Sequence, residues 1–500
     1  MSYLGIDLGT SSVKAVFVDP TGNMLRESSV GYPTNHPAPG AAEQDPADWW
    51  RATGDAVRAL DLGSASVKAI GLTGQMHGLV CLNLVDDVIR PAIIWSDTRG
   101  AEIATQLTAV IGETHLAETT GTALASGFLG VSAAWLRAHE PQLWKSIASV
   151  LLPKDYVRFR LTAERATDPS DAASTGLLDV HKRAWSAPML ETVGLDPSCM
   201  PEIRGSATVA GHLTADAATA LRLEPGLPVV CGGGDAPIAA LASGVGDGRS
   251  LLATLSSGAQ VIVFSDTPAV DSRLRVHTFA SPLDPAQHEC GWYIMGATMV
   301  AGSALYWLRD NVFRASEADA ITDMLAGAGE VPAGANGLVF APYLSGERTP
   351  HFDPRARAVF MGLTSDHDQR HMTRAVMEGV VFALRDALDV VSGLTDIGDG
   401  VVLAGGGARS SLWRQIVADI FDLPVRPSLV ADQSAVGAAL LAAACDLQMP
   451  ATALGEQWAR FDSTVEPISA NVARYGEIRS IFRDIYPTNA DYFHRLGDLG

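Results

Sequence analysis

A hydroxyl-rich turn between two apolar segments near the start of the chain constrains the fold most strongly. Residues 4–8 read Leu-Gly-Ile-Asp-Leu, residues 9–12 are one glycine and three hydroxyl residues, and residues 13–17 are again mostly apolar. This pattern predicts a β-hairpin whose turn offers N–H groups and hydroxyls to phosphate oxygens, with Asp7 placed to hold Mg²⁺ through water. An ordinary hairpin with a polar turn explains the pattern equally well.

The same plan returns in the middle of the chain. Residues 251–264 read Leu-Leu-Ala-Thr-Leu-Ser-Ser-Gly-Ala-Gln-Val-Ile-Val-Phe, which is again an apolar strand, a short hydroxyl-and-glycine turn and a second apolar strand. We interpret this as an internal structural repeat. Because 500 residues exceed what one core comfortably holds, we expect two domains, residues 1–244 and 245–500. Two such hairpins could hold one polyphosphate from both sides.

Two runs of three glycines each follow a predicted buried strand. Residues 232–234 lead to Asp235, where a carboxylate could take the proton from a substrate hydroxyl that attacks a phosphate. An N-cap role also explains Asp235, because Ala236-Pro237 follows, and the two roles are compatible. Residues 405–407 could let an adenine ring lie on backbone, whereas a tight turn alone requires only one or two glycines.

Polar loops in the first half offer hydrogen-bonding groups to a polyol. Residues 75–78 read Gln-Met-His-Gly between two apolar strands, although a lone histidine is more often structural than functional. Asp97 lies in a similar loop at the end of a strand. For Lys154, Asp155 and Asp171 we expect a solvated surface role.

Local signals also predict individual elements. Asp45 followed by proline predicts the start of a helix that ends near Leu60. Apolar spacing predicts an amphipathic helix over 372–391, and small residues predict that a helix over 436–444 packs tightly on a sheet. The chain lacks the Walker-type P-loop sequence and the set of protein-kinase motifs, which disfavours both of those classes.

The net charge and the cysteines limit the classes of partner and the cell compartment that we expect. The net charge of −20 disfavours nucleic acid and anionic membranes as partners, but it permits a nucleotide bound by backbone amides. The five cysteines are scattered without a C-x-x-C pair, which indicates neither disulfides nor a zinc site. No signal-peptide pattern and no apolar stretch long enough to span a bilayer are present, so we expect a cytoplasmic protein.

Several motifs, in order along nearly the whole chain, resemble the FGGY carbohydrate kinases and, within them, the xylulokinase group. Any one motif is weak, but the ordered series is specific. The motifs are Ile6-Asp7-Leu8-Gly9-Thr10-Ser11, Glu43-Gln44-Asp45-Pro46, Gly74-Gln75-Met76-His77-Gly78, Leu152-Pro153-Lys154-Asp155-Tyr156, Ser170-Asp171-Ala172-Ala173, Gly232-Gly233-Gly234-Asp235, Tyr343-Leu344-Ser345-Gly346-Glu347-Arg348-Thr349-Pro350, Phe360-Met361-Gly362-Leu363 and Gly405-Gly406-Gly407-Ala408-Arg409.

The resemblance implies an α/β fold of two actin-like (RNase-H-like) domains with a catalytic cleft between them, and a homodimer. It also implies MgATP-dependent phosphorylation of a terminal sugar hydroxyl, with D-xylulose converted to D-xylulose 5-phosphate. Asp235 would be the catalytic base, and Asp7 would organise the metal and the phosphates. With the loops above, the predicted sugar contacts are Gln75, Met76, His77, Asp97 and Asp235. The predicted ATP contacts are Thr10, Ser11, Lys14, Ser256, Ser257, Gly258, Trp307, Gly405, Gly406 and Gly407.

Some positions depart from the pattern of the xylulokinases. Ala236 stands where an Asn usually follows the catalytic Asp, Val131-Ser132 replace a Pro-Lys pair, and Leu255-Ser256 replace Gly-Thr in the second hairpin. Ribulose, a deoxy-xylulose, gluconate and glycerol therefore stay open as acceptors, and an actin-like ATPase without a metabolic role is the alternative from another class. The sequence also leaves open whether Lys14 reaches a phosphate or lies on the exposed face of the hairpin.

Overall fold

The computed structural model describes residues 2–63 and 66–499. They form two compact units that are discontinuous in sequence. Unit 1 comprises Met1–Asp247, Phe264–Tyr293 and Val430–Ala459, and unit 2 comprises Gly248–Val263, Ile294–Leu429 and Arg460–Gly500. The sequence analysis does not anticipate the two later segments of unit 1, and its boundary between residues 244 and 245 stays a prediction.

The main sheet of unit 1 has the order β13-β14-β5-β1-β2-β3, and β15 also pairs with β5. The predicted first hairpin is confirmed, because β1 and β2 are antiparallel neighbours. Strand β5 lies parallel to β1 on its other side. The bounds are β1 Ser2–Leu8, β2 Ser12–Val18, β3 Met24–Gly31, β5 Val67–Gly74, β13 Val209–His212, β14 Pro228–Val230 and β15 Gly233–Gly234.

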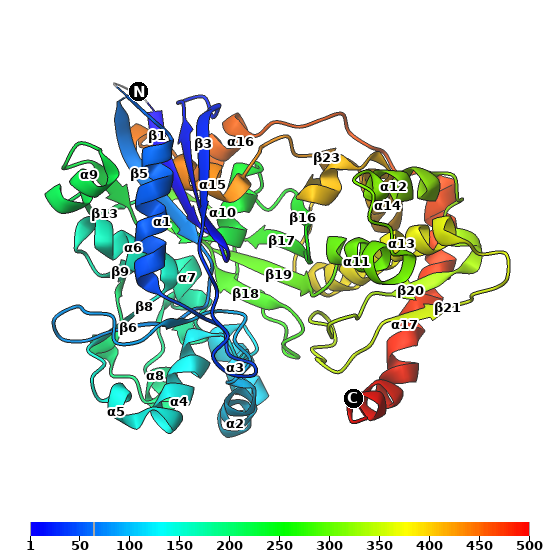
Figure 1. The fold of residues 1–500 in the computed structure, drawn as a ribbon, viewed down its shortest axis with the longest axis horizontal. Coiled ribbons are helices and arrows are strands. Elements are labelled where there is room, and N and C mark those ends of the chain that lie inside the picture. Colours follow the sequence, from blue (N-terminus) through cyan, green and yellow to red (C-terminus); the bar gives the residue numbers. More distant parts are fainter. Residues whose placement is uncertain (1, 64–65, 500) are drawn as a thin grey trace. The chain divides into compact units, whose positions relative to one another are not determined.

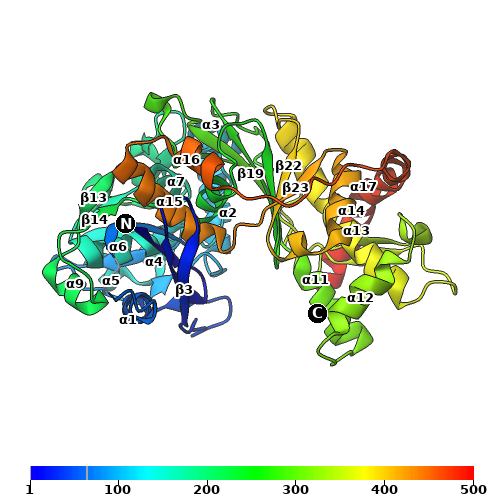
Figure 2. The ribbon, with the colours of Figure 1, turned by 90° about the horizontal axis from the view of Figure 1, so that it is seen from above.

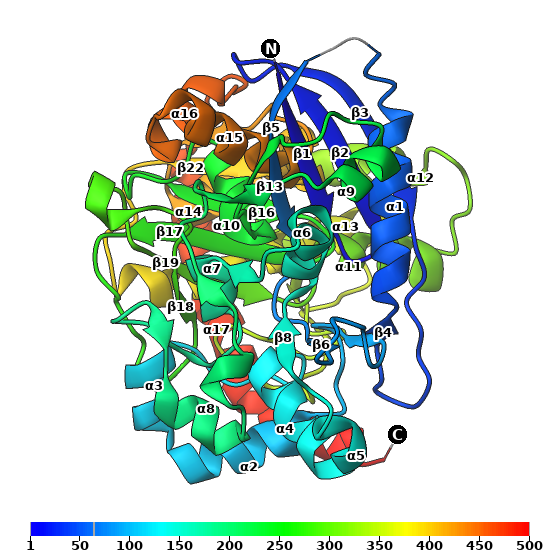
Figure 3. The same ribbon diagram turned by 90° about the vertical axis from the view of Figure 1, so that its left-hand side faces the viewer.

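Side chains alternate along β1 between two faces, each covered by a helix. Leu4 and Ile6 belong to a buried cluster with Trp49 of α1 (Pro46–Ala59), which stands along β1, β2 and β3 in Figure 3. Asp45 caps this helix as predicted, by accepting a hydrogen bond from the Ala47 N–H at 2.9 Å. Because side chains alternate along a strand, Asp7 lies on the face opposite Leu4 and Ile6.

Helix α15 (Gln433–Leu447) covers that second face. A Cβ placed on Gly5 would collide with the Ala435 carbonyl oxygen, and one on Gly71 would collide with that of Ala438. Glycine at these two positions therefore lets the helix backbone approach the sheet closely. The tight packing predicted from small residues is confirmed, although this orange helix packs on the first sheet of the chain, beside its blue strands (Figure 2).

Unit 1 is completed by shorter elements. Its further helices are α2 Ala101–Ile111, α3 Glu113–Thr120, α4 Leu129–His139, α5 Pro141–Trp144, α6 Pro153–Thr162, α7 Pro169–Ala173, α8 Ala187–Val193, α9 Ala215–Leu221, α10 Asp235–Ala242 and α16 Ala451–Trp458. Its further strands are β4 Glu43–Gln44, β6 Val80–Leu82, β7 Ala92–Ile93, β8 Ser149–Leu151, β9 Ala166–Thr167, β10 Leu178–Asp179, β11 Ala184–Trp185, β12 Glu202–Ile203 and β18 His277–Ala280.

The second sheet repeats the plan of the first, in the order β18-β19-β17-β16-β22-β23. Strand β16 pairs antiparallel with β17 and parallel with β22, as β1 does with β2 and β5, which confirms the internal repeat. The bounds are β16 Leu251–Leu255, β17 Ala259–Ser265, β19 Trp292–Thr298, β22 Val401–Ala404 and β23 Val425–Pro427, with a separate pair β20 Val339–Ala341 and β21 Val359–Met361.

Three helices of unit 2, α13, α14 and α17, pack together (Figure 1). The predicted amphipathic helix is confirmed as α13, which runs from Gln369 to Ser392 and buries most of its length. The helices of this unit are α11 Gly302–Trp307, α12 Ala320–Gly329, α13 Gln369–Ser392, α14 Ser411–Phe421 and α17 Ser469–Gly497. Among the described helices of the whole chain, none has the length and apolar character needed to cross a membrane.

Candidate active site

Two predicted carboxylates lie at the same end of the first sheet, where strands β1 and β15 finish. In the parallel ladders of β5, Thr73 pairs with Asp7 on one side and with Gly233 on the other. The Thr73 hydroxyl donates to the Gly233 carbonyl oxygen at 2.8 Å and so fixes this register. Asp235 then begins α10 directly after β15. The sheet topology thus brings Asp7 and Asp235 together from positions more than 200 residues apart in sequence.

Burial makes both carboxyl groups weaker acids than usual. It raises the pKa of Asp7 to about 7, with the nearby charge of Asp235 adding to the rise and the ammonium of Lys14 opposing it. Burial also raises the pKa of Asp235 to about 6, against the lowering effect of the Ala236 N–H, which donates to Asp235 Oδ1 at 2.8 Å. Among the described residues Asp7 Oδ1 has no hydrogen-bond partner. A carboxylate with a pKa near neutrality is suited to general base catalysis.

The position of Lys14 adds a cation to this end of the sheet. Lys14 on β2 is the direct cross-strand partner of Asp7, and its ammonium forms an ion pair with Asp432, the N-cap residue of α15. The structure therefore gives Lys14 a carboxylate partner within unit 1. Its contact with a phosphate stays a prediction.

Of the predicted sugar contacts, Met76 packs on the residue before Asp235, and His77 lies against Phe128 and Ser174. Met76 is buried, and a Cβ placed on Gly234 would lie 2.8 Å from its sulfur, so the thioether packs on the backbone that precedes the base. The His77 ring stacks on Phe128 with centroids 4.2 Å apart. Its Nδ1 lies 2.7 Å from the Ser174 carbonyl oxygen, which can only accept, so Nδ1 carries the proton.

Two other predicted sugar contacts are more enclosed. Gln75 is 1% exposed, and its amide nitrogen donates to Gln44 Oε1 at 2.9 Å, while its Oε1 has no partner among the described residues. Asp97 is 2% exposed and accepts from the Ala42 N–H at 2.8 Å and from the Arg99 guanidinium at 2.9 Å. Asp97 thus supports its own loop, and its contact with a sugar stays a prediction.

The surface role expected for Lys154, Asp155 and Asp171 is wrong, because all three side chains are fully buried. The Lys154 ammonium lies 2.8 Å from Asp155, 2.9 Å from Asp168 and 3.3 Å from Asp171. Charges of both signs in a dry interior need such partners, and Arg158 supplies a second cation, 2.7 Å from Asp155. Apolar neighbours on both sides of the Lys-Asp pair are the sequence signal for burial.

Ser170 connects this buried network to the base and was missed by the sequence analysis as a site residue. Its hydroxyl donates to Asp168 and accepts a hydrogen bond from the Gly234 N–H at 3.0 Å. The network therefore holds the backbone one residue before Asp235. The local sequence carries no signal for this role, because it depends on a contact across 64 residues.

In unit 2 the second hairpin turns at residues 256–258, and the Ser256 and Ser257 side chains are exposed there. The triglycine turn lies beside it. A Cβ on Gly405, whose φ is +83°, would lie 2.5 Å from the Leu255 carbonyl oxygen, and one on Gly407 would lie 2.6 Å from Leu255 Cβ. A Cβ on Gly406 would meet nothing within 4 Å. Close packing thus explains Gly405 and Gly407 but not Gly406.

The remaining predicted nucleotide contacts lie on both units. In unit 1 the Thr10 hydroxyl accepts from the Trp95 indole N–H at 2.9 Å, and Ser11 is exposed. In unit 2 Trp307 ends α11 and stacks near-parallel on Phe340, with centroids 6.2 Å apart. Phosphate and base contacts by these side chains stay predictions.

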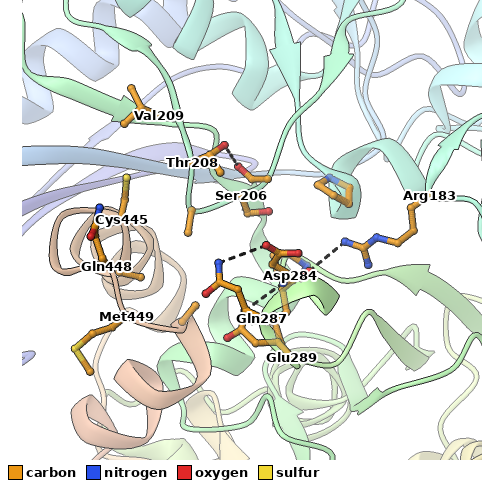
Figure 4. Close-up of a pocket in the computed structure, with 17 residues that line it drawn as sticks. Arg183, Ser206, Thr208, Val209, Asp284, Gln287, Glu289, Cys445, Gln448 and Met449 are labelled. Atoms are coloured by element: carbon orange, nitrogen blue, oxygen red, sulfur yellow. Dashed lines mark hydrogen bonds between the residues drawn. The ribbon is translucent and has the colours of Figure 1, made fainter.

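A separate pocket of about 460 Å³ in unit 1 contains none of the predicted site residues in its described lining (Figure 4). Arg183 lines it and donates to the Leu283 carbonyl oxygen at 3.1 Å. Glu289 faces the same space and accepts from the Thr452 N–H at 3.0 Å. The polar groups named here are thus bonded within the protein.

The sequence matches two family profiles that follow each other along the chain. Residues 2–242 match the N-terminal domain of the FGGY family of carbohydrate kinases, and residues 253–445 match its C-terminal domain. The protein belongs to the FGGY family of carbohydrate kinases. It is therefore a phosphotransferase that uses an alcohol group as acceptor, and the expected class of enzyme is confirmed.

Individual FGGY kinases are similar over most of their length. The xylulose kinase of Escherichia coli K12 is 38% identical over 84% of this chain and 84% of its own. The solved xylulose kinase of Rhodospirillum rubrum is 29% identical with a TM-score of 0.91, covering 99% of this chain and 100% of its own. The solved gluconate kinase of Lactobacillus acidophilus is 25% identical with a TM-score of 0.93, covering 99% of both chains. These likenesses confirm the two-domain α/β fold of FGGY kinases.

The departures from the xylulokinase pattern have different surroundings in this FGGY kinase. Ala236 is the second residue of α10 and offers only a methyl group beside the base. Val131 and Ser132 lie on α4 and are buried. Ala236 is thus the departure that directly follows Asp235 in the chain.

Proposed function

We propose that this FGGY kinase transfers the terminal phosphate of ATP to a terminal hydroxyl of D-xylulose and forms D-xylulose 5-phosphate. The observation that carries the proposal is the placement of Asp235, which begins a helix beside Met76 and has its pKa raised to about 6. A base with this pKa is mostly ionised at neutral pH and ready to accept a proton. The names and similarity of the relatives support xylulose as the acceptor.

In the proposed reaction Asp235 accepts the proton of the sugar hydroxyl as that oxygen bonds to the γ-phosphorus. The bond between the γ-phosphorus and the bridging oxygen of ATP breaks, and ADP leaves. Met76 and His77 orient the sugar in unit 1, and the backbone around Gly406 receives the adenosine in unit 2. Positioning and charge neutralisation supply most of the catalysis in such transfers.

The carboxylates of unit 1 fit a magnesium ion, which stays part of the proposal. Mg²⁺ in kinases is usually held by one or two carboxylates, water and substrate phosphates. Asp7, with an unpartnered buried oxygen, would hold it. The described residues contain no cluster of three or more His, Cys, Asp or Glu suited to a metal, so phosphates would complete the coordination. When bound, the ion would neutralise charge on the phosphates.

Gluconate is the second candidate acceptor. Ala236 gives the residue after the base no hydrogen-bonding group, and a solved gluconate kinase has the same fold at 25% identity. Ribulose and glycerol are further acceptors to compare in the assay. An actin-like ATPase without a carbohydrate substrate is not retained, because the chain is an FGGY kinase.

An ADP-release assay over D-xylulose, D-ribulose, gluconate and glycerol tests the proposal. We expect the highest kcat/KM with D-xylulose. A higher value with another acceptor would make that acceptor the substrate in place of D-xylulose. Asp235→Asn should lower kcat by about 10²–10⁴-fold while ATP still binds. Asp196→Asn, at an exposed helix cap of unit 1, is the matched control and should keep near-normal activity. Near-normal turnover of Asp235→Asn would contradict the assigned base.

We place the enzyme in the cytoplasm with the sugar and ATP as its partners. All five cysteines are free thiols, which suits a reducing compartment. A homodimer is a prediction that analytical ultracentrifugation tests, with a mass of twice 52.5 kDa expected.

A further inference from the structure

We infer that Glu347 is a positioning residue for the second hairpin, residues 256–258, and thereby sets the affinity of the enzyme for the phosphates of its nucleotide. This inference rests on the proposed function of that hairpin in ATP binding. Glu347 belongs to the Gly-Glu-Arg-Thr-Pro motif, to which neither the sequence analysis nor the proposed reaction gives a role.

The first step is a contact between Glu347 and the end of β19. The side chain is 4% exposed, and its Oε1 accepts from the Met299 N–H at 2.9 Å and from the Arg348 N–H at 2.7 Å. Two residues on, the Thr349 N–H donates to the Ala297 carbonyl oxygen at 3.0 Å, and its hydroxyl accepts from the Ala297 N–H at 3.2 Å. Glu347 and Thr349 thus hold two successive points of the segment 297–299.

The second step leads from this segment to the hairpin. The Ala301 N–H donates to the Ser257 carbonyl oxygen at 2.7 Å, and the Gly302 N–H donates to that of Ser256 at 2.8 Å. A Cβ placed on Gly258 would lie 2.8 Å from the Thr298 carbonyl oxygen. The turn therefore rests on the backbone that Glu347 holds, and a displacement of that backbone would move the turn.

The third step is a set of contacts that holds the backbone of Glu347 in place. Its backbone exchanges two hydrogen bonds with Asp353, at 2.9 and 3.0 Å. The Asp353 carboxylate in turn accepts from the Tyr486 hydroxyl at 3.0 Å and lies 2.8 Å from His494 Nε2, both on α17. The C-terminal helix thus braces the motif loop, so that Glu347 has little freedom to follow a moving turn.

The chemistry of the side chain indicates which substitution preserves this role. Burial raises the pKa of Glu347 to about 7, with the Arg348 charge lowering it and the Asp386 charge raising it. Its Oε2 is buried and has no hydrogen-bond partner among the described residues. A glutamine has nearly the same shape, and its amide oxygen accepts from two N–H groups as Oε1 does. Alanine leaves both N–H donors unpaired in the interior.

The test compares Glu347→Ala, Glu347→Gln and Thr349→Val by steady-state kinetics, ADP binding calorimetry and thermal unfolding. We expect Glu347→Ala to raise the KM for ATP and the Kd for ADP at least tenfold while the KM for the sugar stays within twofold. Glu347→Gln should restore both nucleotide constants to within threefold of the unsubstituted enzyme. Thr349→Val removes one hydroxyl and keeps the shape of the side chain, so it should raise the KM for ATP and the Kd for ADP by a smaller factor. This variant tests the inference if Glu347→Ala does not fold.

Glu378→Ala is the matched control for loss of a buried glutamate in unit 2. Glu378 is 2% exposed, and its carboxylate accepts from the Gly334 N–H at 2.9 Å, from Arg374 and from Tyr475, none of which belongs to the segment 297–302. Nucleotide constants that are unchanged in Glu347→Ala and Thr349→Val, or equal effects of Glu347→Ala and Glu378→Ala, would overturn the inference. An unsubstituted enzyme that binds no ADP would instead overturn the proposed function.

Discussion

Lys14 lies directly opposite Asp7 across the β1–β2 ladder, and its ammonium pairs with Asp432. The Lys14 charge lowers the pKa of Asp7, whereas the Asp432 charge raises it. Lys14→Met should therefore move the acid limb of the kcat profile to higher pH, and Asp432→Asn should move it to lower pH. Shifts in the same direction for the two variants would show that Asp7 does not titrate in this limb.

The pH dependence of the unsubstituted enzyme follows from the two raised carboxyl groups. Asp235 must be ionised to accept a proton, and its pKa is about 6 while that of Asp7 is about 7. Below these values each group gains a proton, so kcat should begin to fall near pH 7, by about tenfold per pH unit while one group titrates and by up to about a hundredfold per pH unit below pH 6, where both are protonated. Because the groups interact, the two apparent pKa values belong to the pair. A kcat that stays constant down to pH 5 would contradict this.

Gly406 can be tested apart from Gly405 and Gly407, because a Cβ would meet nothing within 4 Å at Gly406 but would meet Leu255 at the other two positions. Gly406→Leu should raise the KM for ATP, since its side chain would fill the place proposed for adenosine, and leave the melting temperature near that of the unsubstituted enzyme. Gly407→Ala, whose Cβ would lie 2.6 Å from Leu255 Cβ, should lower the melting temperature instead. Unchanged nucleotide kinetics in Gly406→Leu would remove Gly406 from the proposed site.

The buried network around Lys154 predicts a large effect on stability. Lys154→Met removes the cation that lies within 3.3 Å of three buried carboxyl groups. Breaking a buried ion pair on one side typically costs about 3–5 kcal/mol, and calorimetry should show a lower unfolding temperature. Lys145→Met, at an exposed position, should change stability by no more than about 0.5 kcal/mol. Equal stability of the two variants would contradict the role of the network.

Ala236 offers a direct test of acceptor choice. Ala236→Asn places an amide beside the base, and one added hydrogen bond of about 0.5–1.5 kcal/mol would lower the KM for its sugar by about two- to tenfold. We expect this gain with D-xylulose. Ala239→Asn, one turn further along α10, is the control and should leave the KM unchanged. A gain with gluconate and none with D-xylulose would favour gluconate as the acceptor.

Local patterns predicted the parts of the fold that local sequence determines. The two hairpins, the Asp45 cap and the apolar stripe of α13 depend on residues close together in the chain, and all were predicted. The assignment of 430–459 to unit 1 depends on the fit of α15 against Gly5 and Gly71, which no local pattern reveals.

The candidate site likewise contains some features that local sequence predicted and others that it did not. The glycine run before Asp235 predicted a carboxylate at the end of a strand, and the structure places it there. The burial of Lys154 was missed, because its partner Asp168 lies 14 residues away and a charged residue is ordinarily exposed. The pairing of Lys14 with Asp432 spans 418 residues and has no signal in the sequence around either residue.

The return of α15 to the first sheet has a consequence for biosynthesis. The strand that carries Asp7 is made more than 400 residues before the helix that covers its second face. At about 5–20 residues per second, that face stays uncovered for roughly 20 seconds or longer. Unit 1 therefore completes its core only after residue 447 has been made, and a chain released before that point would keep the second face of its first sheet uncovered.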